Sequence, residues 1–532
     1  MTEKRLLVLT IFFTAFAFVI ELNMFYINIS GEYQDKAQNQ QIKQYDIDDD
    51  RGVITDCNFN NITNTTKGYK TLVTAYDDDL QQVFNVLEEY EKTRFEKNIK
   101  NSKNFIADIT QNIENRKIYT VTKRYSNFNI AQHLTGYTDS EGNGVSGIEK
   151  AFDAQLKSAA KVRYLEATVN GYNQITDVVE KEKINNDAQT STILALTVDN
   201  TIQRICEGIA KEYIHDGAII VMESKTGKIK AMVSTPFYSA NNIAAALGQN
   251  NSPLVNKALQ SYEPGSVIKP LWAAVLLENG YNKDKIYCCT GEIEINGHKY
   301  HCNNNKAHGE INMEQALVVS CNCYFINAYT KNKVFSYSQA GDALYFGENL
   351  WLAENYSTTS GYFPSVSELE NSGQLASISF GQGKLLLTPL HITAYMNIFA
   401  NNGRYVYPQV AQGIYDADTK EPIKELYTFS EKQVISANTA QNIKAMLQSV
   451  VEQGAMGRAA PYAFSAGGKT GTAQTGRYDE NGKEILTAWF CGFYPYDNPE
   501  YTICITINNG GESTYTAAPL FKKVCDSLYY LL

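Results

Sequence analysis

The feature that most restricts this fold is an apolar segment near the N-terminus. Residues Leu6 to Ile20 carry no charge, Lys4 and Arg5 precede them, and apolar side chains resume after Glu21. The whole stretch approaches the roughly 20 residues that a helix needs to cross a bilayer. A cleaved signal peptide is the alternative interpretation of the uncharged part. We expect an uncleaved anchor, with residues 1–32 forming a short N-terminus and one transmembrane helix.

The charges that flank this segment predict its orientation. Positive residues are retained on the cytoplasmic side of a membrane, so Lys4 and Arg5 are expected there. The sequence contains no second stretch of comparable length and apolarity. We therefore expect a single-pass protein of the cell membrane, with everything after about residue 30 on the extracytoplasmic side.

Size and composition describe a globular protein with more than one domain. The 532 residues exceed the usual range of a single domain, and the chain is 44% hydrophobic and 20% charged. The net charge of -10 provides no basic patch of the kind that neutralises phosphates. We therefore expect no nucleic-acid partner.

Ten cysteines in an exported chain raise the question of disulfides and metal sites. Cys288 or Cys289 could pair with Cys302, but cysteines in apolar surroundings also pack as small buried side chains. No bridge is predicted. His298, His301 and Cys302 resemble a metal cluster, but no fourth ligand stands at the usual spacing. The sequence predicts no metal and no other cofactor.

The first extracytoplasmic domain is expected over residues 33–185. Its polar, acidic start at 33–50 suits a solvated stalk. Apolar residues at helical intervals predict that residues 77–115 are mostly helix, and "KIYTVTKRYS" alternates like a strand. The stretch "GVSGIEKAFDAQL" predicts a short amphipathic helix after a glycine-rich turn.

The second domain is expected over residues 186–532. It begins with a strand and a helix from about Asn200, followed by a hairpin around "SKTG". Helices and turns dominate from about 266 to 460, and strands return at "SAGGKTGTAQ", "LTAWFCGFYP" and "YTICITINN", before a helical C-terminus. Strands at both ends of a domain with helices between them predict an α+β fold, in which an antiparallel sheet is assembled from distant segments.

The stretch "YEPGSVIKP" contains a candidate nucleophile and its base. Ser266 follows a Pro-Gly turn at the start of a predicted helix, and Lys269 lies three positions later on the same face. A serine needs an adjacent base, and a lysine serves as one only when burial or a nearby cation lowers its pKa. Helix N-terminal N–H groups could stabilise an oxyanion. The alternative is a serine cap followed by an ordinary surface lysine.

Two further motifs favour catalysis over the helix cap. Ser320 and Asn322 stand in "VVSCNCYF", and Lys469 opens the Lys-Thr-Gly of "SAGGKTGTAQ". A Ser-x-x-Lys, a Ser-x-Asn and a Lys-Thr-Gly in this order are the active-site triplet of β-lactamases and penicillin-binding proteins. The sequence therefore predicts a serine acyl-transfer site.

With these motifs in place, the chain resembles the class B penicillin-binding proteins, the monofunctional peptidoglycan transpeptidases, over nearly its whole length. Other stretches similar to the family are "RGVITDCN", where Cys57 stands in place of the commoner arginine, "GVSGIEKAFDAQL", "LTVDNTIQ", "HGEINMEQALVVSCN", "SFGQGKLLLTPLHITAYMNIFANNG" and "AWFCGFYP". The resemblance implies a penicillin-binding transpeptidase domain of the serine β-lactamase type, preceded by a smaller α+β pedestal domain.

The resemblance also implies a role for each motif residue. Ser266 would be acylated and Lys269 would take its proton. Ser320 would relay protons toward the leaving amine, Asn322 would hold Lys269 and the substrate amide, and Lys469 would supply positive charge opposite Ser320. The substrate's terminal carboxylate would be bound by the segment Thr470, Gly471 and Thr472, and the N–H groups of Ser266 and Thr472 would form the oxyanion hole.

The function implied is that of a D,D-transpeptidase. It would attack the D-Ala-D-Ala end of peptidoglycan stem peptides, form crosslinks through an acyl-enzyme and be inhibited by β-lactams such as penicillin. The resemblance also implies a SEDS-family glycosyltransferase as the partner that polymerises glycan. The alternatives are a D,D-carboxypeptidase or β-lactamase, in which water resolves the acyl-enzyme, and a non-catalytic scaffold or β-lactam sensor.

Overall fold

The computed structural model describes residues 3–30, 41–49, 51–126, 129–139, 141–157, 161–184, 192–332 and 336–532. The chain divides into two compact units that are interleaved in sequence. Unit 1 contains residues 1–50, 66–123 and 160–189, and unit 2 contains residues 51–65, 124–159 and 190–532. The predicted pedestal range 33–185 therefore contains two segments, 51–65 and 124–159, that pack with unit 2. The domain boundaries at residues 32 and 185 stay a prediction.

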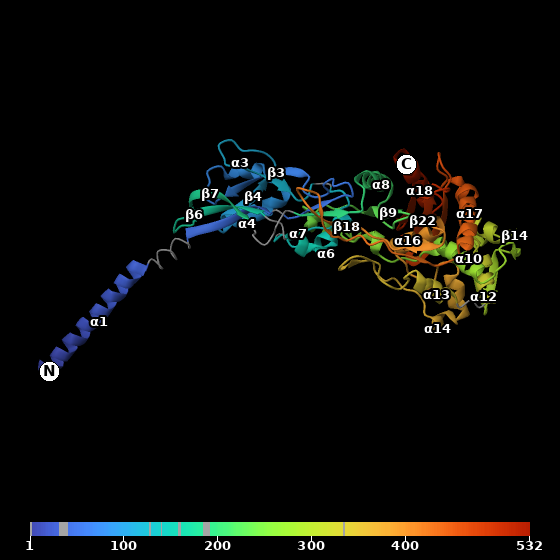
Figure 1. Ribbon diagram of the computed structural model, residues 1–532, viewed down its shortest axis with the longest axis horizontal. Coiled ribbons are helices and arrows are strands. Elements are labelled where there is room, and N and C mark those ends of the chain that lie inside the picture. The colour runs from blue at the N-terminus through green and yellow to red at the C-terminus, as the bar shows by residue number, and fades with distance from the viewer. Residues whose placement is uncertain are drawn as a thin grey trace. The chain divides into compact units, whose positions relative to one another are not determined.

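The N-terminal apolar segment forms one long helix, α1 (Glu3–Ser30) (Figure 1). Its 24 residues from Lys4 to Ile27 have a mean hydropathy of 2.2. Within the described ranges, α1 alone has the length and apolarity to cross a membrane. This fits the predicted single-pass anchor, and the polar stretch 33–40 lies outside the described residues.

The rest of unit 1 contains two three-stranded antiparallel sheets and short helices. One sheet has the order β1 (Ile42–Asp49), β6 (Lys161–Val169), β7 (Ile175–Ile184). The other has the order β4 (Phe105–Ile109), β3 (Thr66–Val73), β5 (Tyr119–Lys123). The helices are α3 (Leu80–Asn85), the 3-10 turn η1 (Glu89–Glu91) and α4 (Lys92–Lys100).

The prediction of helix over residues 77–115 is wrong beyond Lys100. Strand β4 runs through this range, with Phe105, Ala107 and Ile109 in one apolar cluster and Ile106 in another. A strand buried on both faces shows no polar alternation, so its sequence reads as a continuation of a helical pattern. The strand predicted at "KIYTVTKRYS" is confirmed as β5.

Unit 2 is built around a five-stranded antiparallel sheet with the order β10-β9-β23-β22-β21. Its strands are β9 (Gly217–Glu223), β10 (Ile229–Thr235), β21 (Gly467–Tyr478), β22 (Glu484–Tyr494) and β23 (Tyr501–Ile507). The predicted hairpin around "SKTG" and the three late strands are confirmed. The sheet joins segments from the two ends of the domain, as the α+β prediction required.

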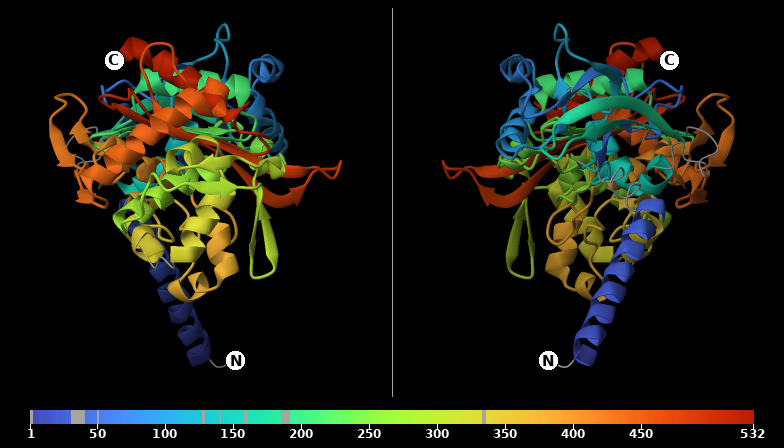
Figure 2. Two further views of the ribbon diagram at one scale, coloured as in Figure 1. Left: turned by 90° about the vertical axis from the view of Figure 1, so that its right-hand side faces the viewer. Right: turned by 90° about the vertical axis from the view of Figure 1, so that its left-hand side faces the viewer.

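Helices cover both faces of this sheet (Figure 2). Phe490 packs with α8 (Asn200–Tyr213) and α18 (Ala517–Leu528). Its neighbours Trp489 and Cys491 belong to the opposite core, formed by α10 (Lys269–Glu278), α16 (Pro389–Ala400) and α17 (Ala437–Gln453). This period of two along β22 is the alternation expected of a strand between two layers. The sheet therefore supports the helices that carry the candidate site.

Smaller elements complete unit 2. A second sheet has the order β19 (Pro422–Glu425), β18 (Ala411–Asp416), β8 (Thr192–Leu196), β2 (Val53–Thr55). Two-stranded pairs are β11 (Tyr287–Cys289) with β14 (Gly309–Ile311), β12 (Glu292–Ile295) with β13 (His298–His301), β15 (Trp351–Ala353) with β16 (Tyr356–Ser357), and β17 (Arg404–Val406) with β20 (Glu431–Gln433).

The remaining helices are α5 (Gln132–Thr135), α6 (Gly147–Ala151), α7 (Asp153–Lys157), α9 (Ile243–Leu247), α11 (Met313–Val318), α12 (Asn322–Asn332), α13 (Ser336–Ala343), α14 (Val366–Leu369) and α15 (Ser372–Ile378). The 3-10 turns are η2 (Lys257–Leu259), η3 (Gly265–Ile268), η4 (Asn303–Asn305), η5 (Gly454–Gly457) and η6 (Tyr529–Leu531).

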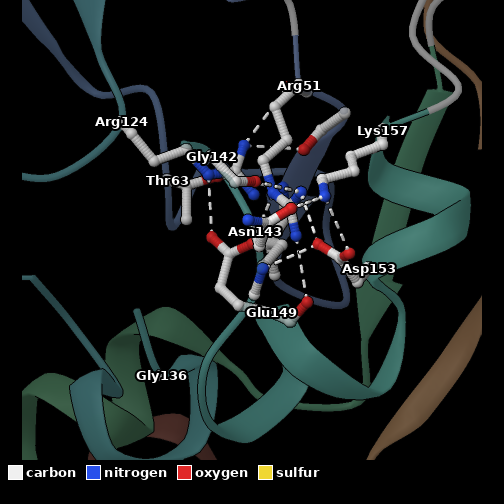
Figure 3. A network of polar contacts seen from close by, with 12 residues as sticks. Arg51, Thr63, Arg124, Gly136, Gly142, Asn143, Glu149, Asp153 and Lys157 are labelled. Carbon is white, nitrogen blue, oxygen red and sulfur yellow. Dashed lines mark hydrogen bonds and ion pairs between the residues drawn. The ribbon is translucent and has the colours of Figure 1, made fainter. Parts of the chain in front are cut away.

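A buried ion-pair network joins two of the segments quoted above, "RGVITDCN" and "GVSGIEKAFDAQL" (Figure 3). Arg51 donates from Nε to Glu149 Oε2 at 2.7 Å, and Arg124 donates from Nε to Oε1 at 2.8 Å. Arg51 and Glu149 are only 3% and 0% exposed. Burial acts to raise the pKa of Glu149, but the two guanidinium groups hold it below its ordinary value. Glu149 is therefore a buried, charged residue that the guanidinium groups of Arg51 and Arg124 neutralise.

Candidate active site

Ser266 lies inside a tight turn and not at a helix cap. The 3-10 turn η3 contains Ser266, and α10 begins directly after it at Lys269. The residues that precede these two helices are Pro264 and Ile268, and neither helix receives a side-chain cap. The helix-cap interpretation of Ser266 is therefore wrong. The predicted helix is present as α10, which starts three residues after Ser266 and ends at Glu278, and Pro270 is accommodated in its first turn.

Neighbouring backbone fixes the turn before Ser266. Gly265 has a φ of 57° and donates its N–H to the carbonyl of Gly381 at 2.9 Å. Gly381 also has a positive φ, and a Cβ atom there would stand only 1.9 Å from the Gly265 oxygen. The Trp489 indole donates to the Glu263 carbonyl at 3.0 Å. The "SFGQGK" loop and strand β22 therefore hold the serine turn from two sides.

Lys269 is fully buried and its ammonium nitrogen meets the Ser-x-Asn motif. Its Nζ lies 2.8 Å from the Ser320 carbonyl oxygen, 2.7 Å from Asn322 Oδ1 and 3.3 Å from Ser320 Oγ. Burial lowers the pKa of Lys269 to about 8, and the nearby thiols of Cys321 and Cys302 oppose this shift. A neutral amine that donates to two of these oxygens keeps its lone pair for a third partner. Lys269 therefore satisfies the main condition for a lysine general base.

Lys469 approaches the same hydroxyl from the sheet. Its Nζ lies 3.1 Å from Ser320 Oγ, so this hydroxyl stands between two buried amines. Burial lowers the pKa of Lys469 well below its ordinary value, and the charge of Lys269 lowers it further. Two amines coupled in this way do not both hold a full charge near neutral pH. Ser320 is therefore placed to pass a proton between them.

The backbone of the Lys-Thr-Gly strand lies directly against the serine turn. A Cβ on Gly471 would be 2.8 Å from the Pro264 oxygen and 2.9 Å from the Val267 nitrogen, which is closer than a side chain tolerates. Thr472 Oγ1 lies 3.0 Å from Ser513 Oγ and accepts the Ser513 N–H at 3.2 Å. Ser513 belongs to the site's surroundings, yet the stretch "GGESTY" offers no motif that would have identified it.

The structure thus brings the three sequence motifs to one place. Hydrogen bonds join Lys269 to Ser320 and Asn322, and Ser320 to Lys469. Ser266 lies in the turn whose backbone packs on Gly471, and Thr470 accepts from Lys469 at 3.2 and 3.3 Å. The catalytic and binding roles of these residues stay a prediction.

A group of potential metal ligands lies beside the Ser-x-Asn motif. All ten cysteines are free, and four ligand atoms, from Cys289, Cys302, His308 and Cys321, lie within 4.8 Å of one another. The cluster considered from the sequence joined Cys302 to His298 and His301, which are exposed residues of β13. The sequence predicted no metal at that cluster, and the fold brings a different histidine, His308, to the sulfur atoms.

Comparison with protein families finds a match over residues 217–526. The matching family is described as the penicillin binding protein transpeptidase domain. The match covers more than half of the 532 residues, and it contains all three motifs of the candidate site.

Comparison with individual proteins gives similar results. The chain is 28% identical over 411 residues to stage V sporulation protein D of Bacillus subtilis, covering 73% of this chain and 60% of that protein. It is 26% identical over 471 residues to the peptidoglycan D,D-transpeptidase FtsI homolog of Mesostigma viride, covering 79% and 74%. A chain in a structure of a peptidoglycan synthase complex superposes with a TM-score of 0.68 at 21% identity, covering 100% and 99%. This likeness shows a shared fold.

Proposed function

Because this chain belongs to the penicillin-binding protein transpeptidase family, as a class B penicillin-binding protein, we propose that it is a membrane-anchored peptidoglycan D,D-transpeptidase. The observation that carries this proposal is the position of Lys269, whose buried nitrogen contacts the Ser-x-Asn motif and shares Ser320 with Lys469. A buried lysine with a lowered pKa, three residues after a serine, is what a serine acyltransferase requires.

The first half of the reaction is acylation of Ser266. Lys269 Nζ takes the proton of the Ser266 hydroxyl while Oγ forms a bond to the carbonyl carbon of the penultimate D-Ala. Backbone N–H groups of Ser266 and Thr472 stabilise the tetrahedral oxyanion. The C–N bond then breaks, and Lys469 and Ser320 deliver a proton to the departing D-Ala amine. An ester between Ser266 and the shortened stem peptide remains.

The second half of the reaction reverses these proton transfers. An amine from a neighbouring stem peptide attacks the ester carbonyl and gives its proton through Ser320 to Lys469. The Ser266–carbonyl bond breaks, Lys269 returns its proton to Ser266 Oγ, and an amide crosslink is released. A β-lactam enters the same first half, but its acyl-enzyme keeps the remainder of the drug attached and persists.

The Lys-Thr-Gly strand is proposed to bind the substrate's terminal carboxylate. Thr470 and Thr472 supply hydroxyl groups, and Lys469 supplies an amine on the same strand. The Thr472 hydroxyl already accepts the Ser513 N–H, which orients it. Gly471 lets the strand lie against the serine turn, so its role is to permit the close approach of carboxylate and nucleophile.

The anchor and the relatives support a place for this enzyme in the cell. We propose that α1 crosses the cell membrane once, with the catalytic unit outside, as the charges of Lys4 and Arg5 indicate. Polymerisation of glycan then needs a partner, and a SEDS-family glycosyltransferase is proposed. The similar peptidoglycan synthase complex, described as coordinating polymerisation and crosslinking, supports this assignment.

Crosslink formation by the purified full chain tests the function. Detergent-solubilised protein is incubated with uncrosslinked peptidoglycan strands, and the digested products are separated by mass. Peptide dimers and free D-Ala are expected from the wild type and from the control Cys288→Ser, but not from Ser266→Ala. Products that are only shortened monomers would assign a carboxypeptidase instead, and rapid turnover of penicillin would assign a β-lactamase.

A further inference from the structure

The cysteine and histidine group beside the Ser-x-Asn motif has the dimensions of a metal site. Its sulfur atoms are separated by 3.8 Å between Cys289 and Cys302 and by 3.6 Å between Cys302 and Cys321. The Cys289 sulfur lies 3.5 Å from His308 Nδ1. In a tetrahedron with Zn–S bonds of about 2.3 Å, neighbouring sulfurs are about 3.8 Å apart and a sulfur and a nitrogen about 3.5 Å. These three separations match those edges, and the other three pairs of ligand atoms lie within 4.8 Å.

From this geometry we propose that the protein binds one Zn²⁺ ion through Cys289, Cys302, His308 and Cys321. Three thiolates and one imidazole are a preferred zinc donor set, and thiolates select against hard cations such as Mg²⁺. The four residues occupy every tetrahedral position, so this is a closed structural site. The ion takes no part in the acyl transfer, and binding releases the thiol protons to solvent.

A disulfide explains this cluster less well than a metal. Oxidation could join two of the thiols, but it would leave the third sulfur and His308 unpaired at the same point. The sulfur–sulfur separations of 3.4 to 3.8 Å are far longer than a bond of about 2.05 Å. Cys323, whose sulfur lies 3.4 Å from that of Cys302, stands next to the four ligands.

The ligands come from four segments that are otherwise weakly connected. Cys289 ends β11, Cys302 follows β13, His308 precedes β14, and Cys321 joins α11 to α12. These strands form only short two-stranded pairs, which have little stability of their own. A shared ion would fix the small hairpins to the helical core.

The position of Cys321 gives the ion a consequence for the active site. Cys321 lies between Ser320, whose φ of 55° is unusual for a residue with a side chain, and Asn322, which holds Lys269. The Asn322 amide also donates to the His301 carbonyl at 2.9 Å, and the Tyr324 N–H donates to the Cys321 sulfur at 3.3 Å. An N–H donor to a metal thiolate is a common supporting contact. The ion therefore positions Ser320 and Asn322 without touching substrate.

Metal content of the full chain tests the site directly. Protein solubilised in detergent and purified without chelators is expected to contain about one zinc ion per chain by elemental mass spectrometry. Cys289→Ser and Cys321→Ser are expected to lose it, while Cys288→Ser, an exposed neighbour outside the cluster, keeps it. A wild type without zinc after incubation with Zn²⁺, or with a disulfide between these cysteines, would overturn the proposal.

Two measurements on the wild type avoid the risk that the variants do not fold. Zinc X-ray absorption is expected to show three sulfurs at about 2.3 Å and one nitrogen at about 2.0–2.1 Å. Four sulfurs would overturn the assignment of His308. Removal of zinc with a chelator is expected to slow penicillin acylation about tenfold, and added Zn²⁺ is expected to restore it. Unchanged acylation by zinc-free protein would contradict the positioning of Ser320, whereas metal content tests the site independently of any activity.

Discussion

Lys269 can take the proton of Ser266 only in its neutral form, and this gives the reaction a predictable pH dependence. Burial lowers the Lys269 pKa to about 8, so the amine loses its proton as pH rises through that value. The rate constant for acylation by penicillin should therefore rise with pH to a plateau, with a midpoint near 8 and about a tenfold fall per pH unit below it.

Stopped-flow acylation with a fluorescent penicillin measures this profile, with circular dichroism at each pH as the control for folding. A rate that is independent of pH, or that falls as pH rises through 8, would contradict Lys269 as the base.

Single residues also show which parts of the candidate site could be predicted from the sequence and which could not. Ser266, Lys269, Ser320 and Asn322 lie in short motifs whose spacing is local, and the order of these motifs with Lys-Thr-Gly matches a known active-site triplet, so the sequence predicted a shared site. Ser513 and His308 reach the same region only through long-range folding. Neither lies in a sequence motif, because the side chains that each contacts, Thr472 for Ser513 and the cysteines for His308, are brought to it by the fold.

At the scale of elements, one of the backbone contacts that hold the serine turn is especially close. A Cβ at Gly381 would stand 1.9 Å from the Gly265 oxygen, so Gly381→Ala must displace the turn that carries Ser266. We expect penicillin acylation to fall at least about tenfold, as misplacement of a catalytic group by a fraction of an ångström does.

Gly280→Ala is the matched control for this substitution. Gly280 also has a positive φ, but a Cβ there meets no atom within 4 Å. It should cost about 1 kcal/mol of stability and leave acylation unchanged. Equal acylation by both variants would show that contact with Gly381 does not position the serine.

The buried Arg51–Glu149–Arg124 network predicts that neutralising Glu149 lowers the stability of the protein strongly. Glu149→Gln puts a neutral amide beside Arg124 and beside Arg51, which keeps only Asp153 as a carboxylate partner at 2.9 Å, so the free energy of unfolding should fall by about 3–5 kcal/mol. The effect should shrink as pH falls, because the charge of Glu149 contributes only above its lowered pKa. Urea unfolding of the full chain at two pH values measures both.

Glu180→Gln is the control for the network. Glu180 pairs with Arg163 at 2.6 Å, but both side chains are about one third exposed. Its loss should cost no more than about 1 kcal/mol. Similar costs for the two variants would contradict a structural role for the buried charge.

Secondary structure was predictable where a period or a turn identified the element. Helix α8 has one buried face, and the hairpin β9–β10, whose strands are buried on both faces, was identified by the turn "SKTG" between two apolar runs; both matched the expectation. Strand β4 did not, since apolar residues on both of its faces remove the alternation that marks a strand. The two-stranded pairs around Cys289 and Cys302 were missed because such short strands hardly differ from turns.

At the scale of the whole molecule, the proposed anchor and the candidate catalytic residues lie in separate parts of the chain. All candidate catalytic residues belong to unit 2, whereas α1 belongs to unit 1. Deletion of residues 1–30 should therefore release the protein from the membrane fraction and leave its rate of penicillin acylation within about twofold of the full chain. Fractionation followed by fluorescent-penicillin gels measures both. A truncated chain that stays membrane-bound would contradict α1 as the anchor.

The interleaving of the two units could not be predicted from sequence. Segments 51–65 and 124–159 pack with the rest of unit 2 because β2 pairs with β8, and because Ile54, Leu134 and Phe152 share one apolar core with Leu194. The Arg51–Glu149–Arg124 network joins the two segments to each other. A linear reading of composition assigns such segments to their neighbours in the chain.

The most direct test of a serine acyltransferase is the site of its covalent adduct. Full-length protein is treated with penicillin, its intact mass is measured, and the modified peptide is sequenced. One penicillin per chain is expected, attached to Ser266, and Ser266→Ala should gain no mass. An adduct on another residue, or equal labelling of Ser266→Ala, would contradict the assignment of Ser266 as the nucleophile.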